Sequence, residues 1–246
     1  MMMETVSFLT GKDKRLAGIL HLSSTKSKTG MIILHGLLAS KDQSWMKELG
    51  ERLSKEQNVA VMRFDFLGNG ESDGTLQEHT YEQALEDTRA AIKFMRERGF
   101  TRIFLLGHSL GGAIALITAS NQEIAGVIGL AAVSNPPFIA KRITKRQQET
   151  IVVEIGNGSV ALPKPFVESA QRFPMEKYIS KVSCSVCLVH GTADTVLFPK
   201  DSEFLLKALT EVKDKELHLV KDANHVFSSH WHEVFDIVLE WIAKHA

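Results

Sequence analysis

One serine of the sequence stands in a setting typical of an activated nucleophile. Residues 105–112 read LLGHSLGG, so Ser109 has Gly107 two positions before it and Gly111 two positions after it. The apolar residues up to Leu106 predict a strand, and the run 113–116 predicts a helix. A G-x-S-x-G sequence between a strand and a helix makes a tight, strained turn that exposes the serine hydroxyl. The pattern predicts that Ser109 acts as a nucleophile.

A serine hydroxyl needs a base to become nucleophilic, and the base needs a carboxylate to orient it. The elbow motif predicts the chain order serine, acid, histidine. Asp194 follows a predicted strand at a glycine turn, and His225 lies in the loop between the last strand and the last helix. The rival position for the acid, residues 133–135, reads Val-Ser-Asn and offers no carboxylate. We therefore predict Asp194 and His225 as partners of Ser109, with Asp222 as the alternative acid, although it is more typical of a turn.

An oxyanion intermediate would need two backbone N–H donors near the serine. One is the N–H of Leu110, directly after the serine. The second is expected in the loop after the first long apolar strand, which reads Leu-His-Gly-Leu-Leu over residues 34–38, so Leu37 is the candidate. Three histidines, His35, His108 and His190, neighbour these positions but are not expected to react.

Strands and helices alternate along the chain. Uninterrupted apolar runs predict parallel strands covered on both faces at 31–34, 59–64, 102–106, 125–130, 186–189 and 216–220. An antiparallel hairpin is predicted at 6–9 and 16–20, and helices at 40–57, 80–98, 110–121, 200–210 and 229–244. The order predicts an α/β fold with a mostly parallel sheet of about eight strands flanked by helices. Ligands bind at the carboxyl ends of such strands, where the candidate residues lie.

Residues 136–181 interrupt this alternation. The segment contains a basic, helix-like patch at 141–146, a hairpin turn at 155–159 and a short helix near 166–173. The basic patch is interpreted as a solvated face, with a docking site for anionic substrates or lipids as the alternative. Both ends of the segment lie near the carboxyl edge of the sheet, which predicts that it covers Ser109. We expect a single domain over 1–246 with a cap inserted at 136–181.

The bulk composition excludes several classes of protein. Lys plus Arg number 29 and Asp plus Glu number 29, so a zero net charge gives no reason to expect nucleic acid or an anionic membrane as partner. No run of about 18 apolar residues predicts a membrane span. The first residues, MMMET, do not resemble a signal peptide. A cytoplasmic enzyme or binding protein is therefore expected.

Two other motifs are interpreted as structural. Cys184 and Cys187 lead into a predicted strand and are too few for a closed four-ligand zinc site, so we expect small buried apolar side chains rather than a redox or metal role. The glycine-rich stretch 65–72 lacks the G-K-[ST] ending of a phosphate-binding loop. Its Asp65 and Ser72 are expected to brace a turn beside the site.

Taken in order, these motifs resemble those of the α/β-hydrolase superfamily over nearly the whole chain. The matching features are a His-Gly pair, a glycine-rich turn, the serine elbow, a His-Gly-x-x-Asp sequence and an Asn-His pair, at residues 35–36, 65–72, 107–111, 190–194 and 224–225. Within the superfamily, the insert with Gly156-Asn157-Gly158 is similar to the cap of bacterial cinnamoyl and feruloyl esterases. Leu110 stands where some of those esterases have glutamine.

The resemblance implies an α/β-hydrolase fold and a serine esterase that cleaves small-molecule carboxylic esters through an acyl-enzyme. In that mechanism His225 deprotonates Ser109, Asp194 orients the imidazole, and the N–H groups of Leu37 and Leu110 bind the oxyanion. No metal ion or organic cofactor is required. Cinnamoyl, feruloyl or short-chain acyl esters are expected substrates. The alternatives are a thioesterase, monoacylglycerol lipase or acyl-peptidase with the same triad, and a binding protein without catalysis.

Overall fold

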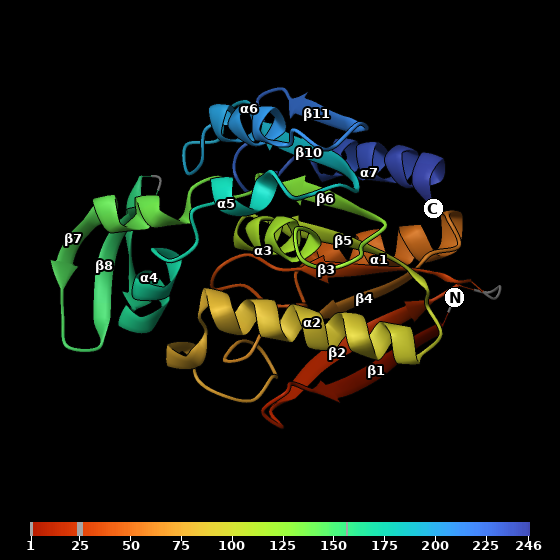
Figure 1. Ribbon diagram of the computed structural model, residues 1–246, viewed down its shortest axis with the longest axis horizontal. Helices are drawn as coiled ribbons and strands as arrows, with labels where there is room; N and C mark the ends of the chain where they lie inside the picture. The colour runs from red at the N-terminus through yellow and green to blue at the C-terminus, as the bar shows by residue number, and fades with distance from the viewer. Residues whose placement is uncertain (1, 24–26, 156) are drawn as a thin grey trace.

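The computed structural model describes residues 2–23, 27–155 and 157–246, and for residues 139–141, 143, 144, 146 and 155 it describes the backbone only. Within these ranges the main body is built on an eight-stranded sheet in the order β1-β2-β4-β3-β5-β6-β10-β11 (Figure 1). The strands are β1 Met2–Leu9, β2 Arg15–Leu22, β3 Thr29–Leu34, β4 Ala60–Phe64, β5 Arg102–His108, β6 Gly126–Leu130, β10 Ser185–Gly191 and β11 Lys215–Val220. The predicted fold class is confirmed.

The sheet is parallel from β4 to β11 and antiparallel at one edge. The hairpin strand β1 pairs antiparallel with β2, and β2 pairs antiparallel with β4. The remaining neighbours pair in parallel, as their continuous apolar runs predict. All the parallel strands therefore end at the same edge, where the candidate residues were expected to meet.

Helices cover both faces of this sheet. Successive residues of a strand point to opposite faces, so Ile32 and Leu34 of β3 lie in one core cluster whereas Met31 and Ile33 lie in the other. The first cluster packs under α2, α3 and α6, and the second packs under α1 and α7. The helices are α1 Ser44–Glu56, α2 Tyr81–Glu97, α3 Leu110–Ala119, α6 Pro199–Ala208 and α7 Trp231–His245, with a 3₁₀ turn, η1, at Leu76–Glu78. None of the described helices combines the length and apolar character needed to cross a bilayer.

The segment between β6 and β10 forms a small sheet of its own at one end of the molecule (Figure 1). It contains the 3₁₀ helix η2 Pro136–Arg142, the antiparallel strands β7 Ile143–Arg146, β8 Thr150–Ile155 and β9 Gly158–Pro163, and the helices α4 Lys164–Ala170 and α5 Glu176–Ile179. The helix-like interpretation of 141–146 was wrong beyond Arg142, because the β-branched pair Ile143-Thr144 starts a strand that pairs with β8. The predicted hairpin pairs Ile155 with Gly158, and Gly156 lies outside the described residues.

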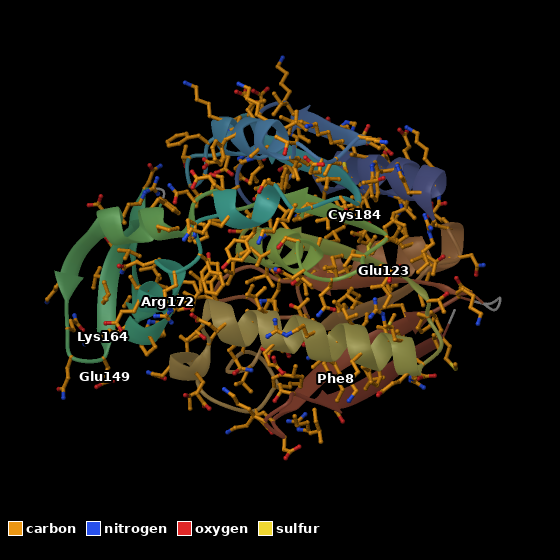
Figure 2. The ribbon with its side chains drawn as sticks, viewed as in Figure 1. Phe8, Glu123, Glu149, Lys164, Arg172 and Cys184 are labelled. Carbon is orange, nitrogen blue, oxygen red and sulfur yellow. The ribbon has the colours of Figure 1, made fainter. Side chains whose placement is uncertain are left out.

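Helix α4 attaches this segment to the start of α2. Ser169 accepts a hydrogen bond from the N–H of Tyr81 at 2.9 Å and donates one to Glu82. Arg172 also pairs with Glu82 at 2.7 Å, on the side of the segment that faces the main body (Figure 2). The Phe166 ring packs beside that of Tyr81, with centroids 5.6 Å apart. Apolar and polar contacts therefore fix the position of the segment relative to the main sheet.

The turn after β4 is braced as expected. Asp65 accepts hydrogen bonds from the backbone N–H groups of Lys41 at 2.7 Å and Glu71 at 2.9 Å, while Ser72 donates to the carbonyl of Asp65 at 2.6 Å. The expectation of two buried cysteines holds for Cys187, whereas Cys184 is only half-buried because it precedes β10. Burial raises the pKa of the Cys184 thiol to about 11.

Candidate active site

Ser109 lies at the turn between β5 and α3, in a backbone conformation that few residues adopt. Its φ is 54° and its ψ is −113°. The turn is so tight that a Cβ on Gly107 would lie 2.1 Å from the carbonyl oxygen of Gly111, and a Cβ on Gly111 would lie 2.2 Å from that of Leu34. Only glycine is compatible with either approach. The two glycines therefore permit the strained conformation that exposes the serine hydroxyl.

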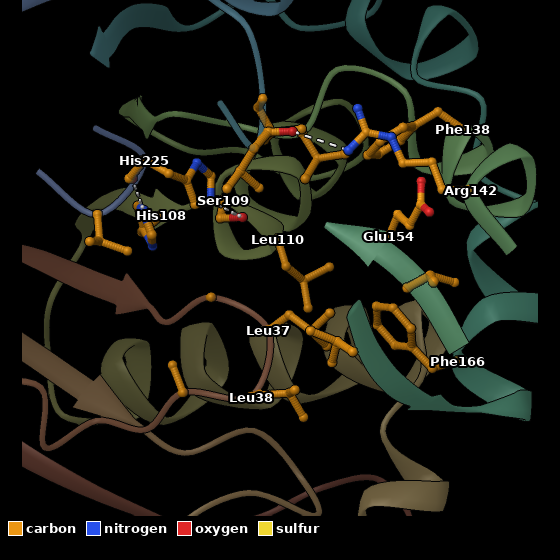
Figure 3. Close-up of a pocket in the computed structure, with 18 of the residues that line it drawn as sticks. Leu37, Leu38, His108, Ser109, Leu110, Phe138, Arg142, Glu154, Phe166 and His225 are labelled. Atoms are coloured by element: carbon orange, nitrogen blue, oxygen red, sulfur yellow. Dashed lines mark hydrogen bonds between the residues drawn. The ribbon is translucent and has the colours of Figure 1, made fainter. Parts of the chain in front are cut away.

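The structure brings together the three side chains that the sequence predicts (Figure 3). The Ser109 Oγ lies 3.1 Å from Nε2 of His225, and Nδ1 of His225 lies 2.7 Å from Oδ2 of Asp194. Since an ionised carboxylate can only accept, Nδ1 carries the proton and Nε2 is free to accept from the serine. Ser109 follows β5, Asp194 follows β10 and His225 follows β11, so the parallel sheet positions groups that are far apart in sequence.

Asp194 is almost completely buried, at 3% exposure, and its carboxylate is saturated with donors. Oδ1 accepts from the N–H groups of Val196 at 2.8 Å and Leu197 at 2.9 Å, while Oδ2 contacts both His225 and His190. Burial by itself would raise the Asp194 pKa, but hydrogen bonds from His190 and His225 hold it well below its usual value. The carboxylate therefore remains ionised over the pH range in which a histidine base works.

Asp222, the alternative acid, lies in an exposed turn, as its sequence context also predicts. Its φ is 58°, a left-handed conformation, and its backbone N–H donates to the hydroxyl of Thr192 at 2.8 Å. None of the described hydrogen bonds joins its side chain to His225. The geometry places Asp194, rather than Asp222, against the imidazole.

Leu37 and Leu110 line the same cavity as Ser109. Leu110 is the first residue of α3, so its N–H has no partner one turn earlier in the helix. His35, fully buried, donates from Nδ1 to the carbonyl of Gly36 at 2.8 Å and accepts from the N–H of Phe66 at 3.1 Å. Because a peptide unit is planar and trans, fixing the Gly36 carbonyl also fixes the direction of the Leu37 N–H.

Two further histidines hold the reacting groups in place. His108 donates from Nε2 to the carbonyl of His225 at 2.8 Å, and burial lowers the pKa of His108 to about 4, so it stays neutral. His190 lies between Asp194 and Ser202, with Nδ1 2.7 Å from the Ser202 hydroxyl. The sequence predicts that both residues lie near the site but does not predict these contacts. His108 and His225 are 117 positions apart in the chain, whereas His190 contacts residues 4 and 12 positions away.

A cavity of about 250 Å³ opens beside Ser109. Its walls come partly from the main body and partly from the 136–181 segment, and most of them are apolar. The main body contributes Gly36, Leu37, Leu38, Tyr81, Leu110, Val133, Val196 and Leu197 among others, and the segment contributes Phe138, Arg142, Val153, Glu154, Val160 and Phe166. The segment residues were not predicted individually, because loop and strand residues at this distance in sequence have no periodicity that marks them as neighbours of the serine.

Among the described residues, two groups of side chains outside this cavity have ligand atoms close enough together for a metal ion. Asp42, Asp65 and Glu71 converge, but the ammonium of Lys41 already lies 2.7, 3.1 and 2.6 Å from them. The second group consists of Cys187, Glu216 and His218 on β10 and β11. Neither group lines the cavity beside Ser109, so neither can assist chemistry there.

Comparisons with known proteins agree with this fold. A family model described as the alpha/beta hydrolase fold matches residues 30–172. Among solved structures, this chain is similar to Est1E from Butyrivibrio proteoclasticus, in a structure with ferulic acid bound. The TM-score is 0.85 at 23% sequence identity, and the match covers 98% of each chain. That degree of identity is evidence for the fold alone.

Curated relatives carry several hydrolase names. The chain is 31% identical to the protein YfhR of Salmonella typhimurium, itself called uncharacterized, over 76% of this chain and 63% of that one. The chain therefore spans about three fifths of that relative's length. It is 27% identical to the palmitoyl-protein thioesterase ABHD10 of Mus musculus over 70% of this chain and 61% of that one. Esterase and monoglyceride lipase also occur among the relatives' names.

Proposed function

Because this chain belongs to the α/β-hydrolase fold family, we propose that it is a serine hydrolase that cleaves carboxylic esters through an acyl-enzyme intermediate. The observation that carries the proposal is the continuous contact from Asp194 through His225 to Ser109 at the edge of an apolar cavity. A nucleophile, a base and an orienting carboxylate in hydrogen-bond reach are the requirement for acyl transfer at a serine.

In the proposed mechanism, Nε2 of His225 removes the proton of Ser109 as Oγ attacks the ester carbonyl. The N–H groups of Leu37 and Leu110 stabilise the resulting oxyanion, each by about 3–4 kcal/mol. Asp194 stabilises the imidazolium, which then protonates the departing alcohol. Water, deprotonated by the same imidazole, releases the acyl group and regenerates Ser109.

We assign residues 136–181 the role of a cap. Six of its described residues, from Phe138 to Phe166, line the cavity beside the serine, while the groups proposed to react all come from the main body. In this arrangement the cap selects the substrate and the main body performs the chemistry. The rings of Tyr81, Phe138 and Phe166 favour an aromatic or short aliphatic group in the cavity. A cinnamoyl-type ester is supported by the similarity to the fold of Est1E in its ferulic acid complex.

A thioesterase is the second candidate, supported by the similarity to the mouse palmitoyl-protein thioesterase. The two candidates are separated by one panel of substrates: 4-nitrophenyl esters of increasing acyl length, a cinnamoyl ester, an acyl-CoA thioester and an aminoacyl anilide. We expect kcat/KM to be at least tenfold higher for an oxygen ester than for the thioester or the anilide. A higher value for the thioester would replace the proposal with the second candidate. If the wild type hydrolysed no substrate of the panel faster than Ser109→Ala does, both candidate functions would be rejected.

A further inference from the structure

Among the described residues that line the cavity, one basic side chain has no part in the proposed chemistry. Arg142, the last residue of η2, is the only Lys or Arg among the described residues that line it. Figure 3 shows its guanidinium on the side of the cavity formed by the cap, with Glu154 of β8 beside it. Arg142 is half-buried, and a charged group in a mostly apolar cavity loses part of its hydration unless something pairs with it.

Among the described residues, Arg142 makes two contacts, which leave most of its donors without a partner in that part of the chain. The guanidinium lies over the Phe138 ring, 4.6 Å from the centroid, and Nη1 donates to the carbonyl of Val196 at a long 3.4 Å. A guanidinium has five N–H donors. Within the described part of the chain, no carboxylate lies within ion-pair distance of it; Glu154, although it lines the same cavity, is exposed and is not paired with it.

Arg63 is an example of an arginine in this protein whose guanidinium has several hydrogen-bond and ion-pair partners. Arg63, which is buried, lies 2.9 Å from Asp42 and donates to the carbonyl of Lys41 at 2.6 Å and to His21 at 3.0 Å. The contact with the Phe138 ring restricts the movement of the Arg142 guanidinium, so less rotamer entropy is lost when it binds a planar anion. The edge of the guanidinium is therefore a preorganised site for a carboxylate, which it can bind through two parallel hydrogen bonds.

We propose that Arg142 binds a carboxylate carried by the substrate, so that the preferred substrates are esters with a carboxylate remote from the bond that is cleaved. This inference rests on the proposed ester hydrolysis and narrows its substrate class. Glu154 opposes the binding of a carboxylate, because its own negative charge repels an anion in the same cavity. Its exposure to solvent screens this repulsion, so the attraction of Arg142 dominates.

The test uses two pairs of esters that differ only in charge. In the first pair, 4-nitrophenol is esterified with adipic acid, whose other carboxyl is either free or a primary amide. In the second pair, butyrate is esterified with 3-hydroxybenzoate or with 3-hydroxybenzamide. The first pair carries the carboxylate on the acyl side of the scissile bond and the second on the alcohol side. The readout is the ratio of kcat/KM for the charged ester to kcat/KM for its neutral partner.

We expect a ratio of about ten or more in at least one pair for the wild-type enzyme, since a charge-assisted bidentate contact is among the stronger polar interactions. The ratio should fall to near or below one in Arg142→Gln, remain intermediate in Arg142→Lys, and rise in Glu154→Gln. Lys145→Gln is the matched control: Lys145 is an exposed cation of β7 that does not line the cavity, so its loss should leave the ratio unchanged.

A wild-type ratio near or below one in both pairs, or a high ratio that persists in Arg142→Gln, would overturn the inference. A ratio lowered by Glu154→Gln would also contradict it. The neutral esters report separately on the proposed function. If the wild type hydrolyses them no faster than Ser109→Ala does, the proposal of an ester hydrolase has failed, whereas their hydrolysis without charge preference rejects only the role of Arg142.

Discussion

At the scale of single residues, three buried histidines surround the groups proposed to react, and each holds a different one. His35 fixes the peptide that presents the Leu37 N–H, His108 holds the backbone of His225, and His190 contacts the carboxylate of Asp194. His35 also accepts from the N–H of Phe66 after β4, and His108 of β5 contacts the loop after β11, whereas His190 of β10 contacts Asp194 in the following loop and Ser202 of α6. The reacting groups are therefore held by polar contacts as well as by packing, which keeps their geometry before a substrate binds.

Asp194→Asn tests the assignment of the acid. The amide cannot accept from His225 Nδ1 in the way a carboxylate does, which leaves the imidazole in the wrong tautomer and removes the stabilisation of its cation. We expect kcat to fall by about 10⁴-fold, as in serine proteases, in a protein that still folds. Asp222→Asn is the matched control and should remain close to wild type. A damaging Asp222→Asn combined with a mild Asp194→Asn would show that the other carboxylate is the acid.

At the scale of elements, the cap is expected to control selectivity rather than chemistry. Phe138 of η2 and Val160 of β9 line the cavity, whereas the groups proposed to react follow strands of the main body. Because such side chains change the fit of one substrate more than another, Phe138→Ala or Val160→Ala should shift the ratio of kcat/KM for a bulky aryl ester to that for an acetyl ester by tenfold or more. Glu149→Ala, at the exposed outer turn between β7 and β8 (Figure 2), should not shift it. Parallel loss of both activities, or no shift at all, would show that the cap does not select the substrate.

The elements of the main body could be predicted from sequence because their signals are local. The continuous apolar runs of β3 to β6, the three-four spacing of α7 and the glycines around Ser109 each specify a structure within a few residues. Chain order then placed Asp194 and His225 at the same edge. The cap was harder, since its strands lack clear alternation, and residues 143–146 became a strand only through pairing with β8. The contacts of His35, His108 and His190 depend on the complete fold and could not be foreseen.

At the scale of the whole molecule, burial of neutral imidazoles ties stability to pH. Burial lowers the pKa of His21 and of His108 to about 4, and that of His79 to about 3. In the unfolded chain these groups titrate near 6.5. Above that pH the imidazoles are neutral in both the folded and the unfolded state, and they do not reduce the free energy of unfolding. As the pH falls towards 4, the unfolded state takes up protons that the folded state does not bind, so the free energy of unfolding decreases.

We expect the free energy of unfolding to be highest near pH 7–8 and to fall between about pH 6.5 and 4, by up to about 3 kcal/mol for each of these imidazoles. Asp87 acts in the opposite direction: burial raises its pKa to about 6, so its contribution is greatest at acid pH and is lost as the pH rises through 6. Because three imidazoles lower the free energy of unfolding on acidification and only one carboxyl raises it, we expect a net decrease.

Urea unfolding at a series of pH values from 8 to 4.5 measures how steeply the free energy of unfolding changes with pH. His79→Phe keeps the packing against Phe166 and should make this pH dependence less steep. An equal pH dependence in the two proteins would contradict the role given to the buried imidazole.

The most direct measurement of the central claim is the site at which a fluorophosphonate reacts. This probe forms a covalent bond with a serine only when a base activates the hydroxyl and an oxyanion site accepts the phosphonyl oxygen. After incubation, digestion and mass spectrometry, we predict a stoichiometric adduct on the peptide that contains Ser109, none in Ser109→Ala, and strongly slowed labelling in His225→Ala. An unmodified Ser109 in folded wild-type protein, or an adduct on a different residue that persists in Ser109→Ala, would contradict the assignment of Ser109 as the nucleophile.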